Sequence, residues 1–214
     1  MSQAITQTTT ASPAPSVAES RIPEYQIATQ FIDRWSPRSF TVDAIPEATL
    51  FSFFEAARWA PSASNEQPWR FIYSLRGSDS WDSFISLLSD NNRLWGRNAS
   101  ALVVIVSKAT RVSRENGEII KSRSHSFDTG AAWANLALQA SLSGWATHAI
   151  GGFDREKARE VLRIPAEYHV EAAVAIGKRG EKASLPEALQ HRENPNGRLP
   201  LNQIVFQNAF ASEK

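Results

Sequence analysis

Hydrophobic residues recur at two different spacings along the chain, and each spacing predicts a type of element. Residues three and four positions apart predict a helix that starts at Pro46 and buries one face, formed by Leu50, Phe53, Phe54 and Ala57. The run 101–106 is apolar at every position, which is typical of a strand buried on both faces. The chain therefore combines amphipathic helices with at least one fully buried strand.

Caps and turn residues delimit the remaining elements. The pattern predicts further helices over 23–33, 80–88, 128–143 and 154–163, and further strands over 71–75, 147–152 and 170–176. Residues 108–125 are charged and turn-rich, which predicts a mobile surface excursion, and residues 198–210 are expected to form an extended arm with apolar side chains. Strands and helices are mixed without a repeat or an internal linker, so one α+β domain is predicted over 22–214. Residues 1–21 are expected to be a disordered tail.

Composition narrows the possible chemistry. Of the 214 residues, 42% are hydrophobic, which is enough for a substantial core. The net charge is +1, so neither nucleic acid nor anionic membrane is expected as a partner. The chain has no cysteine, which excludes disulfides and thiol catalysis. Without a long apolar run or a recognisable secretory signal, a cytoplasmic protein is expected.

Motifs of hydrolases and nucleotide-binding proteins do not occur in the sequence. It has no Walker loop, no Gly-x-Gly-x-x-Gly after a strand and no Gly-x-Ser-x-Gly elbow. The four histidines lack metal-ligand spacing and are interpreted as surface or hydrogen-bonded residues: His125, His148, His169 and His191. If the protein is an enzyme, a bound cofactor is therefore expected to supply the chemistry, and no metal site is predicted.

Two polar segments remain as candidates for binding. Pro37 forces Ser36 out of helical conformation, and alternate side chains of an extended segment share a face, so Arg34, Ser36 and Arg38 form a candidate anion clamp. A solvated basic edge is the simpler explanation of this trio alone. The second segment, residues 60–69, is a loop with two prolines and many short polar side chains, which suits a polar ligand or an ordinary helix-to-strand connection.

The two segments together resemble the FMN-dependent nitroreductase family. The first match is Arg34-x-Ser36-x-Arg38, and the second runs from Ala60 to Phe71. Four further pieces follow in the family's order, at 92–95, 128–130, 150–154 and 198–201. The resemblance covers the chain from about residue 22 to 206 and implies the family's fold, a mostly antiparallel sheet flanked by helices.

The resemblance also implies which residues hold the phosphate and the flavin ring. Arg34, Ser36 and Arg198 are similar to the family's phosphate contacts, and Arg38 to the cation that faces N1 and O2 of the ring. Asn92 is similar to the asparagine at the pyrimidine edge of the ring.

Two further segments have implied roles. The residues similar to those that reach FMN bound by a partner subunit are Pro61, Ser62, Asn65 and Gln67. The segment implied to stack behind the ring, with a backbone N–H that meets flavin N5, is Ile150, Gly151 and Gly152. A homodimer follows from these roles, with the C-terminal arm reaching the partner.

The function implied is an FMN-dependent oxidoreductase of nitroreductase type. NADH or NADPH would reduce the flavin, and a nitroaromatic, a quinone or a similar small electron acceptor would then take the electrons. A dehydrogenation or reductive dehalogenation on the same fold, and a flavin-binding protein without turnover, remain as alternatives. The chain departs from some members at Trp95, Gly151 and Asn196, where those carry Lys, Glu and Lys, and its segment between Val106 and Asp128 is short.

Overall fold

A four-stranded antiparallel sheet forms the centre of the molecule in the computed structural model, which describes residues 21–210. The strand order is β1-β2-β6-β5, so β2 and β6 are the inner strands. The bounds are β1 Trp69–Leu75, β2 Ala101–Lys108, β5 Ala146–Ile150 and β6 Tyr168–Gly177. The four predicted strands are thus confirmed. The predicted tail 1–21 lies outside the described residues except for Arg21.

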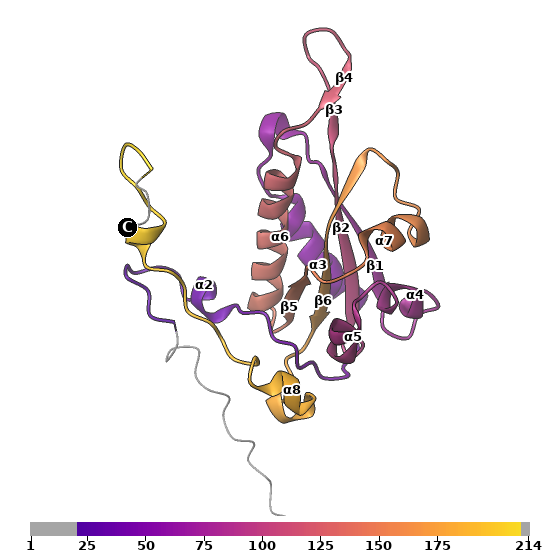
Figure 1. Cartoon of the computed structure of the whole chain (residues 1–214), viewed down its shortest axis with the longest axis vertical. Coiled ribbons are helices and arrows are strands. Elements are labelled where there is room, and N and C mark those ends of the chain that lie inside the picture. The colour runs from indigo at the N-terminus through magenta and orange to yellow at the C-terminus, as the bar shows by residue number, and fades with distance from the viewer. Residues whose placement is uncertain (1–20, 211–214) are drawn as a thin grey trace, which may run out of the picture.

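The apolar run of β2 separates two hydrophobic clusters, because its alternate side chains point to opposite faces of the sheet. Ala101, Val103 and Ile105 pack in the cluster under α3, Glu47–Arg58, and α6, His125–Leu142. Leu102, Val104 and Val106 pack in the other cluster. That cluster is covered by the short helices α4, Trp81–Ile85, α5, Asp90–Gly96, and α7, Arg155–Val161 (Figure 1). Burial on both faces explains why the run contains no polar residue.

The long helix α6 packs its small side chains against α3 within the same chain. Ala132, Leu136 and Ala140 are fully buried beside Phe53 and Ala57 of α3. The alanine-rich face of α6 therefore has its packing partner within the same chain.

Two segments differ from the sequence-based expectation. The predicted helix 23–33 is wrong except for its last turn, α2, Gln30–Asp33, because residues 22–29 are exposed and bury no apolar face that would stabilise a helix. The charged surface excursion 108–125 contains a hairpin that the sequence did not predict, formed by β3, Thr110–Val112, and β4, Ile119–Lys121. The hairpin projects beyond the sheet at the end where α6 begins (Figure 1).

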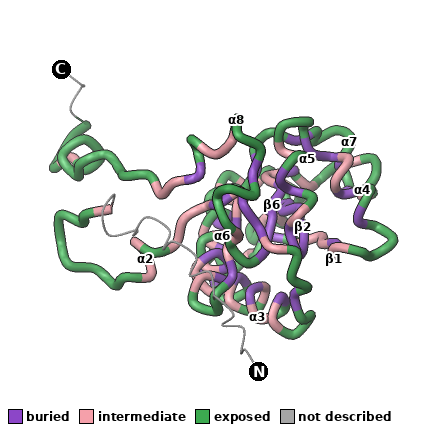
Figure 2. Tube along the Cα trace, turned by 90° about the horizontal axis from the view of Figure 1, so that it is seen from below, coloured by how far each residue is buried: buried purple, intermediate pink, exposed green. Residues whose placement is uncertain are grey.

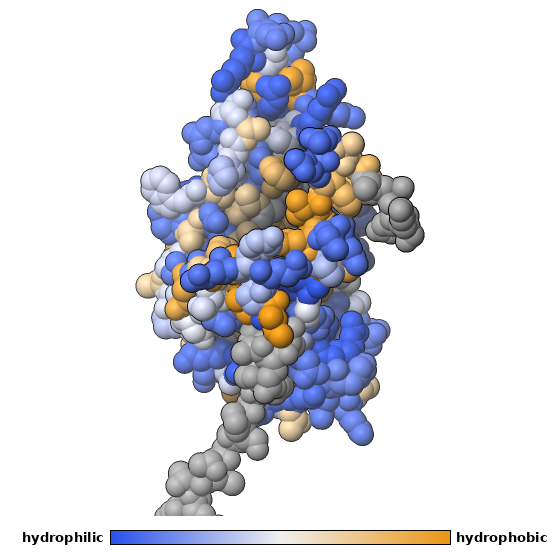
Figure 3. Space-filling model, turned by 90° about the vertical axis from the view of Figure 1, so that its left-hand side faces the viewer, coloured by the Kyte–Doolittle hydropathy of each residue, from blue (hydrophilic) through white to orange (hydrophobic). Residues whose placement is uncertain are grey.

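Both ends of the described chain form arms on one side of the molecule. The N-terminal arm is formed by residues 21–29, and the C-terminal arm by residues 196–210, which follow the short helix α8, Glu187–Gln190. Both arms lie away from the sheet (Figures 1 and 2). Their exposed apolar side chains include Ile22, Tyr25, Ile27, Leu199, Ile204, Val205 and Phe210. Figure 3 faces this side and shows hydrophobic residues among hydrophilic ones. Among the described helices, none has the length and apolar character needed to cross a membrane.

Candidate functional site

Five arginines surround one cavity of about 180 Å³. Two come from the extended segment after α2, Arg34 and Arg38, and Arg198 comes from the C-terminal arm. The others, Arg21 and Arg192, lie more than 170 residues apart in sequence. The remaining lining residues are Trp35, Ser36, His148, Asn194 and Asn196. The structure therefore brings together all four predicted phosphate and N1 contacts, Arg34, Ser36, Arg38 and Arg198.

Backbone contacts fix the segment that carries the clamp. The buried carboxylate of Glu193 accepts the backbone N–H of Arg38 at 2.9 Å and that of Ser39 at 2.9 Å. The guanidinium of Arg21 donates to the carbonyls of Ile32 and Arg34 at 2.7 and 2.6 Å. The C-terminal segment and the N-terminal arm therefore hold the clamp in place from two sides.

The protein balances the charge of the cavity only in part. Burial and the neighbouring Arg192 lower the pKa of Arg38, and the buried carboxylate of Glu193 opposes this shift. Within residues 21–210, no carboxylate oxygen lies within 4.0 Å of a guanidinium nitrogen of these five arginines. Burial lowers the pKa of Arg34, and the neighbouring Arg198 lowers it further. Burial likewise lowers the pKa of Arg21, with Arg198 and Arg34 adding to the effect. Partly desolvated cations that repel one another favour a bound anion, and guanidinium groups match phosphate oxygens in geometry.

His148 of β5 forms an uncharged wall of the same cavity. Burial lowers its pKa to about 4, despite the hydrogen bond that Nδ1–H donates to the carbonyl of Pro37 at 2.9 Å. Its ring packs on Trp95 with 4.7 Å between centroids. Because the imidazole is neutral at pH 7, it adds no charge to the arginine cluster.

The glycine segment after β5 exposes its backbone beside Asn92. The carbonyl of Gly152 accepts the Nδ2–H of Asn92 at 2.9 Å and the N–H of Ser89 at 3.1 Å. A Cβ at Gly151 would meet nothing within 4 Å, whereas one at Gly152 would lie 2.7 Å from Asn92 Nδ2. No neighbour in the chain requires glycine at 151, so the open space beside Gly151 fits a ligand that approaches the backbone closely. Ile150 is buried in the core behind this segment.

The polar loop with Pro61, Ser62, Asn65 and Gln67 lies at the opposite end of α6 from the arginines. The N–H of Ala63 donates to the buried Asp128, in the first turn of α6, at 3.1 Å. Arg34 and Pro37 instead border a second cavity together with Ser141 and Gly144, at the other end of the helix. Asp128 and Ser141 are thirteen residues apart, about 20 Å along the helix, so the loop and the arginine cavity do not meet within one chain.

The same loop has a strained, fixed backbone. Ser64, Asn65 and Gln67 have φ angles of 54°, 58° and 49°, the left-handed region that residues other than glycine rarely adopt. The N–H of Gln67 donates to Ser62 Oγ at 3.0 Å, and Arg114 of the hairpin donates to the carbonyl of Ser64 at 3.0 Å. Strain at exposed polar residues is typical of loops that contact a ligand or a partner.

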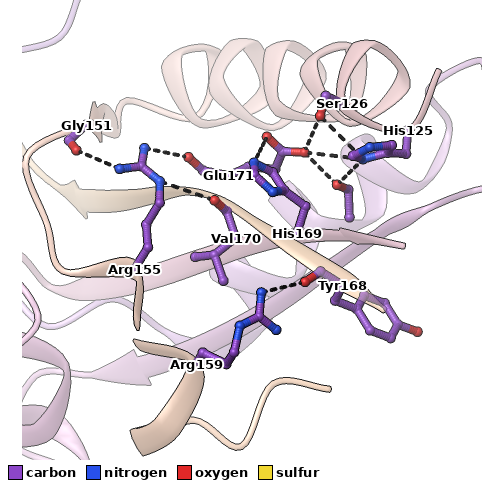
Figure 4. A network of polar contacts seen from close by, with 10 residues as sticks. His125, Ser126, Gly151, Arg155, Arg159, Tyr168, His169, Val170 and Glu171 are labelled. Atoms are coloured by element: carbon purple, nitrogen blue, oxygen red, sulfur yellow. Dashed lines mark hydrogen bonds and ion pairs between the residues drawn. The ribbon is translucent and has the colours of Figure 1, made fainter. Parts of the chain in front are cut away.

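A second polar cluster connects β2, α6 and β6 (Figure 4). Glu171 accepts from the hydroxyls of Ser107 and Ser126 at 2.5 and 2.6 Å, and His125 and His169 lie 3.7 and 3.8 Å from its oxygens. A nucleophilic triad is excluded, because the single nitrogen Nδ1 of His125 faces both the buried Ser107 and the carboxylate. Among the described residues, no three His, Asp or Glu side chains are placed to hold a metal ion.

Sequence reasoning missed several residues of the arginine cavity. Arg21, Arg192 and His148 are isolated in the sequence and join the cavity only through the fold. No local signal identifies them, although Arg192 lies only six residues before the predicted Arg198 in the sequence.

Comparison with known proteins identifies the family of the chain. The model of the nitroreductase family matches residues 32–80 and 74–178. Protein DrgA of Synechocystis is 32% identical over 174 residues, 71% of this chain and 80% of DrgA. NADH dehydrogenase of Thermus thermophilus is 26% identical over 88% of this chain and 98% of its own. The crystal structure of an oxidoreductase containing FMN is 43% identical, with a TM-score of 0.88 over 94% of this chain and 100% of that one. The resemblance and the fold expected from the sequence are thus confirmed, and the chain belongs to the nitroreductase family.

Proposed function

We propose that the protein is an FMN-dependent oxidoreductase that uses NADH or NADPH to reduce small electron acceptors such as nitroaromatics or quinones. The observation that carries this proposal is the arginine cavity, whose five cations form no ion pair within 4.0 Å among the described residues. His148, which lines the cavity, precedes the open backbone of Gly151 by three residues in the chain, and the two features together suit a ligand with a phosphate and a flat ring. The relative that contains FMN, at 43% identity, supports the same ligand.

Each group of residues has a distinct part in this proposal. Arg34, Ser36 and Arg198 bind the phosphate, for which their donors and charge are suited. Arg38 supplies a positive charge at the ring, and Glu193 fixes its backbone. Asn92 and the segment from Ile150 to Gly152 orient the ring. The chemistry that bound FMN supplies is acceptance of a hydride from NAD(P)H and delivery of the electrons to a second substrate in a ping-pong scheme.

A homodimer completes the site in this proposal. The loop with Pro61, Ser62, Asn65 and Gln67 is about 20 Å from the arginine cavity along α6, so in this proposal it contributes to the cavity of a partner subunit. The arms provide exposed apolar side chains, among them Ile204 and Val205, that a second copy would cover. A stable interface of this kind buries about 2,000 Å² or more.

The function is tested by spectroscopy followed by turnover. The purified protein is expected to show flavin absorbance, to lose it on anaerobic addition of NADH or NADPH, and to regain it with a quinone or nitroaromatic. Reduction without reoxidation by any acceptor would favour a flavin carrier, and reoxidation only by an unsaturated or halogenated substrate would favour a specialised reaction. A protein that binds no FMN at micromolar concentration would contradict the proposal.

A further inference from the structure

Arg155, the first residue of α7, donates to the backbone of two separate segments. Its Nη1 lies 3.4 Å from the carbonyl of Gly151, and its Nε and Nη2 lie 3.3 Å from the carbonyls of Val170 and Glu171 (Figure 4). The guanidinium also stacks on Phe153, with 4.8 Å between its carbon and the ring centroid. All three nitrogens are therefore used to join the segment after β5 to the start of β6.

The charge of Arg155 is not taken up by an ion pair. No carboxylate of residues 21–210 lies within 4.0 Å of it, and the carboxylate of Glu171 is engaged by Ser107 and Ser126 instead. A planar guanidinium that spans three carbonyls fixes their relative positions, because its donors cannot move independently. The arrangement suits a residue that sets backbone geometry.

The segment that Arg155 holds has few other restraints. Gly151 and Gly152 are exposed and have no side chain to pack. Asn92 and Ser89 hold the carbonyl of Gly152, so the carbonyl of Gly151 depends on Arg155 and on the N–H of Phe153. Loss of Arg155 would release one of the two restraints on the Gly151 carbonyl.

We propose that Arg155 is a positioning residue, which sets the backbone of Gly151 for the ligand in the candidate site. The ligand in this inference rests on the proposed function, whereas the restraint on Gly151 does not. Arg155 does not itself contact the ligand in this proposal, and it acts through the peptide that it holds.

A matched control lies one turn further along the same helix. Arg159 also donates only to carbonyls, those of Ile164, Pro165 and Tyr168, at 3.3, 2.8 and 2.8 Å. Its contacts hold the segment that leads from α7 to β6 and do not reach Gly151. Arg155→Met and Arg159→Met thus remove the same kind of hydrogen bond from the same helix. Arg155→Lys keeps the positive charge but lacks the planar guanidinium that donates to three carbonyls at once.

Hydrogen exchange of the flavin-free protein tests the restraint directly. The N–H groups of Phe153 and Asp154 are hydrogen-bonded within the chain and report on the segment. Arg155→Met is expected to speed their exchange about tenfold, the effect of losing a hydrogen bond to a charged group, and Arg159→Met to speed only that of residues 164–168. Unchanged exchange at 153 and 154 in Arg155→Met would overturn the inference, whether or not the protein binds FMN. If Arg155→Met does not fold, Arg155→Lys serves in its place.

Titration with FMN tests the link to the ligand. Arg155→Met is expected to weaken FMN binding about tenfold and to shift the visible spectrum of bound FMN, whereas Arg159→Met leaves both unchanged even if it lowers the melting temperature. Equal affinities and spectra in the two variants would overturn the positioning role. A parent protein that binds no FMN would contradict the proposed function instead, and hydrogen exchange would still decide the restraint on Gly151.

Discussion

At the scale of single residues, His148 couples the candidate site to pH. Its imidazole is held neutral beside the arginines because burial lowers its pKa to about 4, against 6.5 in an unfolded chain. Between these two values the unfolded chain binds a proton that the folded protein does not. The contribution of His148 to stability is therefore present above pH 6.5 and is lost as the pH falls towards 4.

We expect this effect to appear in the free energy of unfolding. The shift corresponds to about 3 kcal/mol, lost between pH 6.5 and 4. His148→Asn keeps a donor for the carbonyl of Pro37 and should flatten that part of the pH profile, as measured by denaturant unfolding. The exposed His191→Asn is the control and should leave the profile unchanged. A parent-like pH dependence in His148→Asn would show that other groups are responsible.

Alanine substitutions at Gly151 and Gly152 are expected to distinguish an effect on ligand binding from an effect on the stability of the fold. The space beside Gly151 is open, so Gly151→Ala should leave the melting temperature within about 1 °C of the parent and still weaken FMN binding. Gly152→Ala would push its Cβ against Asn92, so it should lower the melting temperature itself. Thermal unfolding without flavin, followed by FMN titration, measures both. Undiminished FMN affinity in Gly151→Ala would place the ligand away from Gly151.

At this scale the sequence predicted the clamp but not the whole cavity. Arg34, Ser36 and Arg38 share a face because alternate residues of an extended segment do so, and the structure confirms their common cavity. Arg21 and Arg192 could not be assigned, because only the tertiary fold brings the two arms of the chain together. The restraint of Arg155 on Gly151 depends in the same way on long-range contacts with β6.

At the scale of elements, Asp128 connects the long helix to the strained loop. Its carboxylate is 4% exposed and accepts the N–H of Ala63, next to three residues with left-handed φ. The helix was predicted within three residues at its start, because its apolar periodicity is strong. The hairpin 110–121 was missed, because its strands are only three residues each and belong to neither hydrophobic cluster.

We expect Asp128→Ala to destabilise the protein by about 1.5–3 kcal/mol, the worth of a hydrogen bond to a charged group. Asp128→Asn keeps an acceptor oxygen and should cost less. Denaturant unfolding gives the two free energies, and limited proteolysis between residues 61 and 67 should be faster in Asp128→Ala. Equal stability in Asp128→Ala and the parent would mean that the loop holds its conformation without α6.

At the scale of the whole molecule, the loop and the arginine cavity lie apart in one chain, and the proposed dimer would bring the loop of one chain to the cavity of the other. The apolar arms are the surface that a partner would cover in this proposal. The sequence predicted the C-terminal arm from its apolar residues, whereas the packing of α6 on α3 could not be predicted, because it depends on which faces the fold brings together. The dimer remains a prediction.

Light scattering tests the dimer. The parent should have twice the 23.7 kDa mass of the chain at micromolar concentration. Ile204→Glu places a charge on the exposed C-terminal arm and should shift the protein towards the monomer with loss of FMN. Val42→Glu, also at an exposed position but outside the arms, should not. A stable parent monomer that is fully loaded with flavin would exclude the shared site.

The central claim, that the arginine cavity holds the phosphate of FMN, is tested most directly by comparing FMN with riboflavin, which lacks the phosphate. Titration of the flavin-free parent should show FMN binding at least about 100-fold more tightly, since several charge-assisted contacts are involved. In the Arg34→Ala, Arg198→Ala double variant this ratio should collapse to within about tenfold, with riboflavin affinity nearly unchanged. Equal affinity of the parent for FMN and riboflavin, or a ratio that the double variant preserves, would contradict the account.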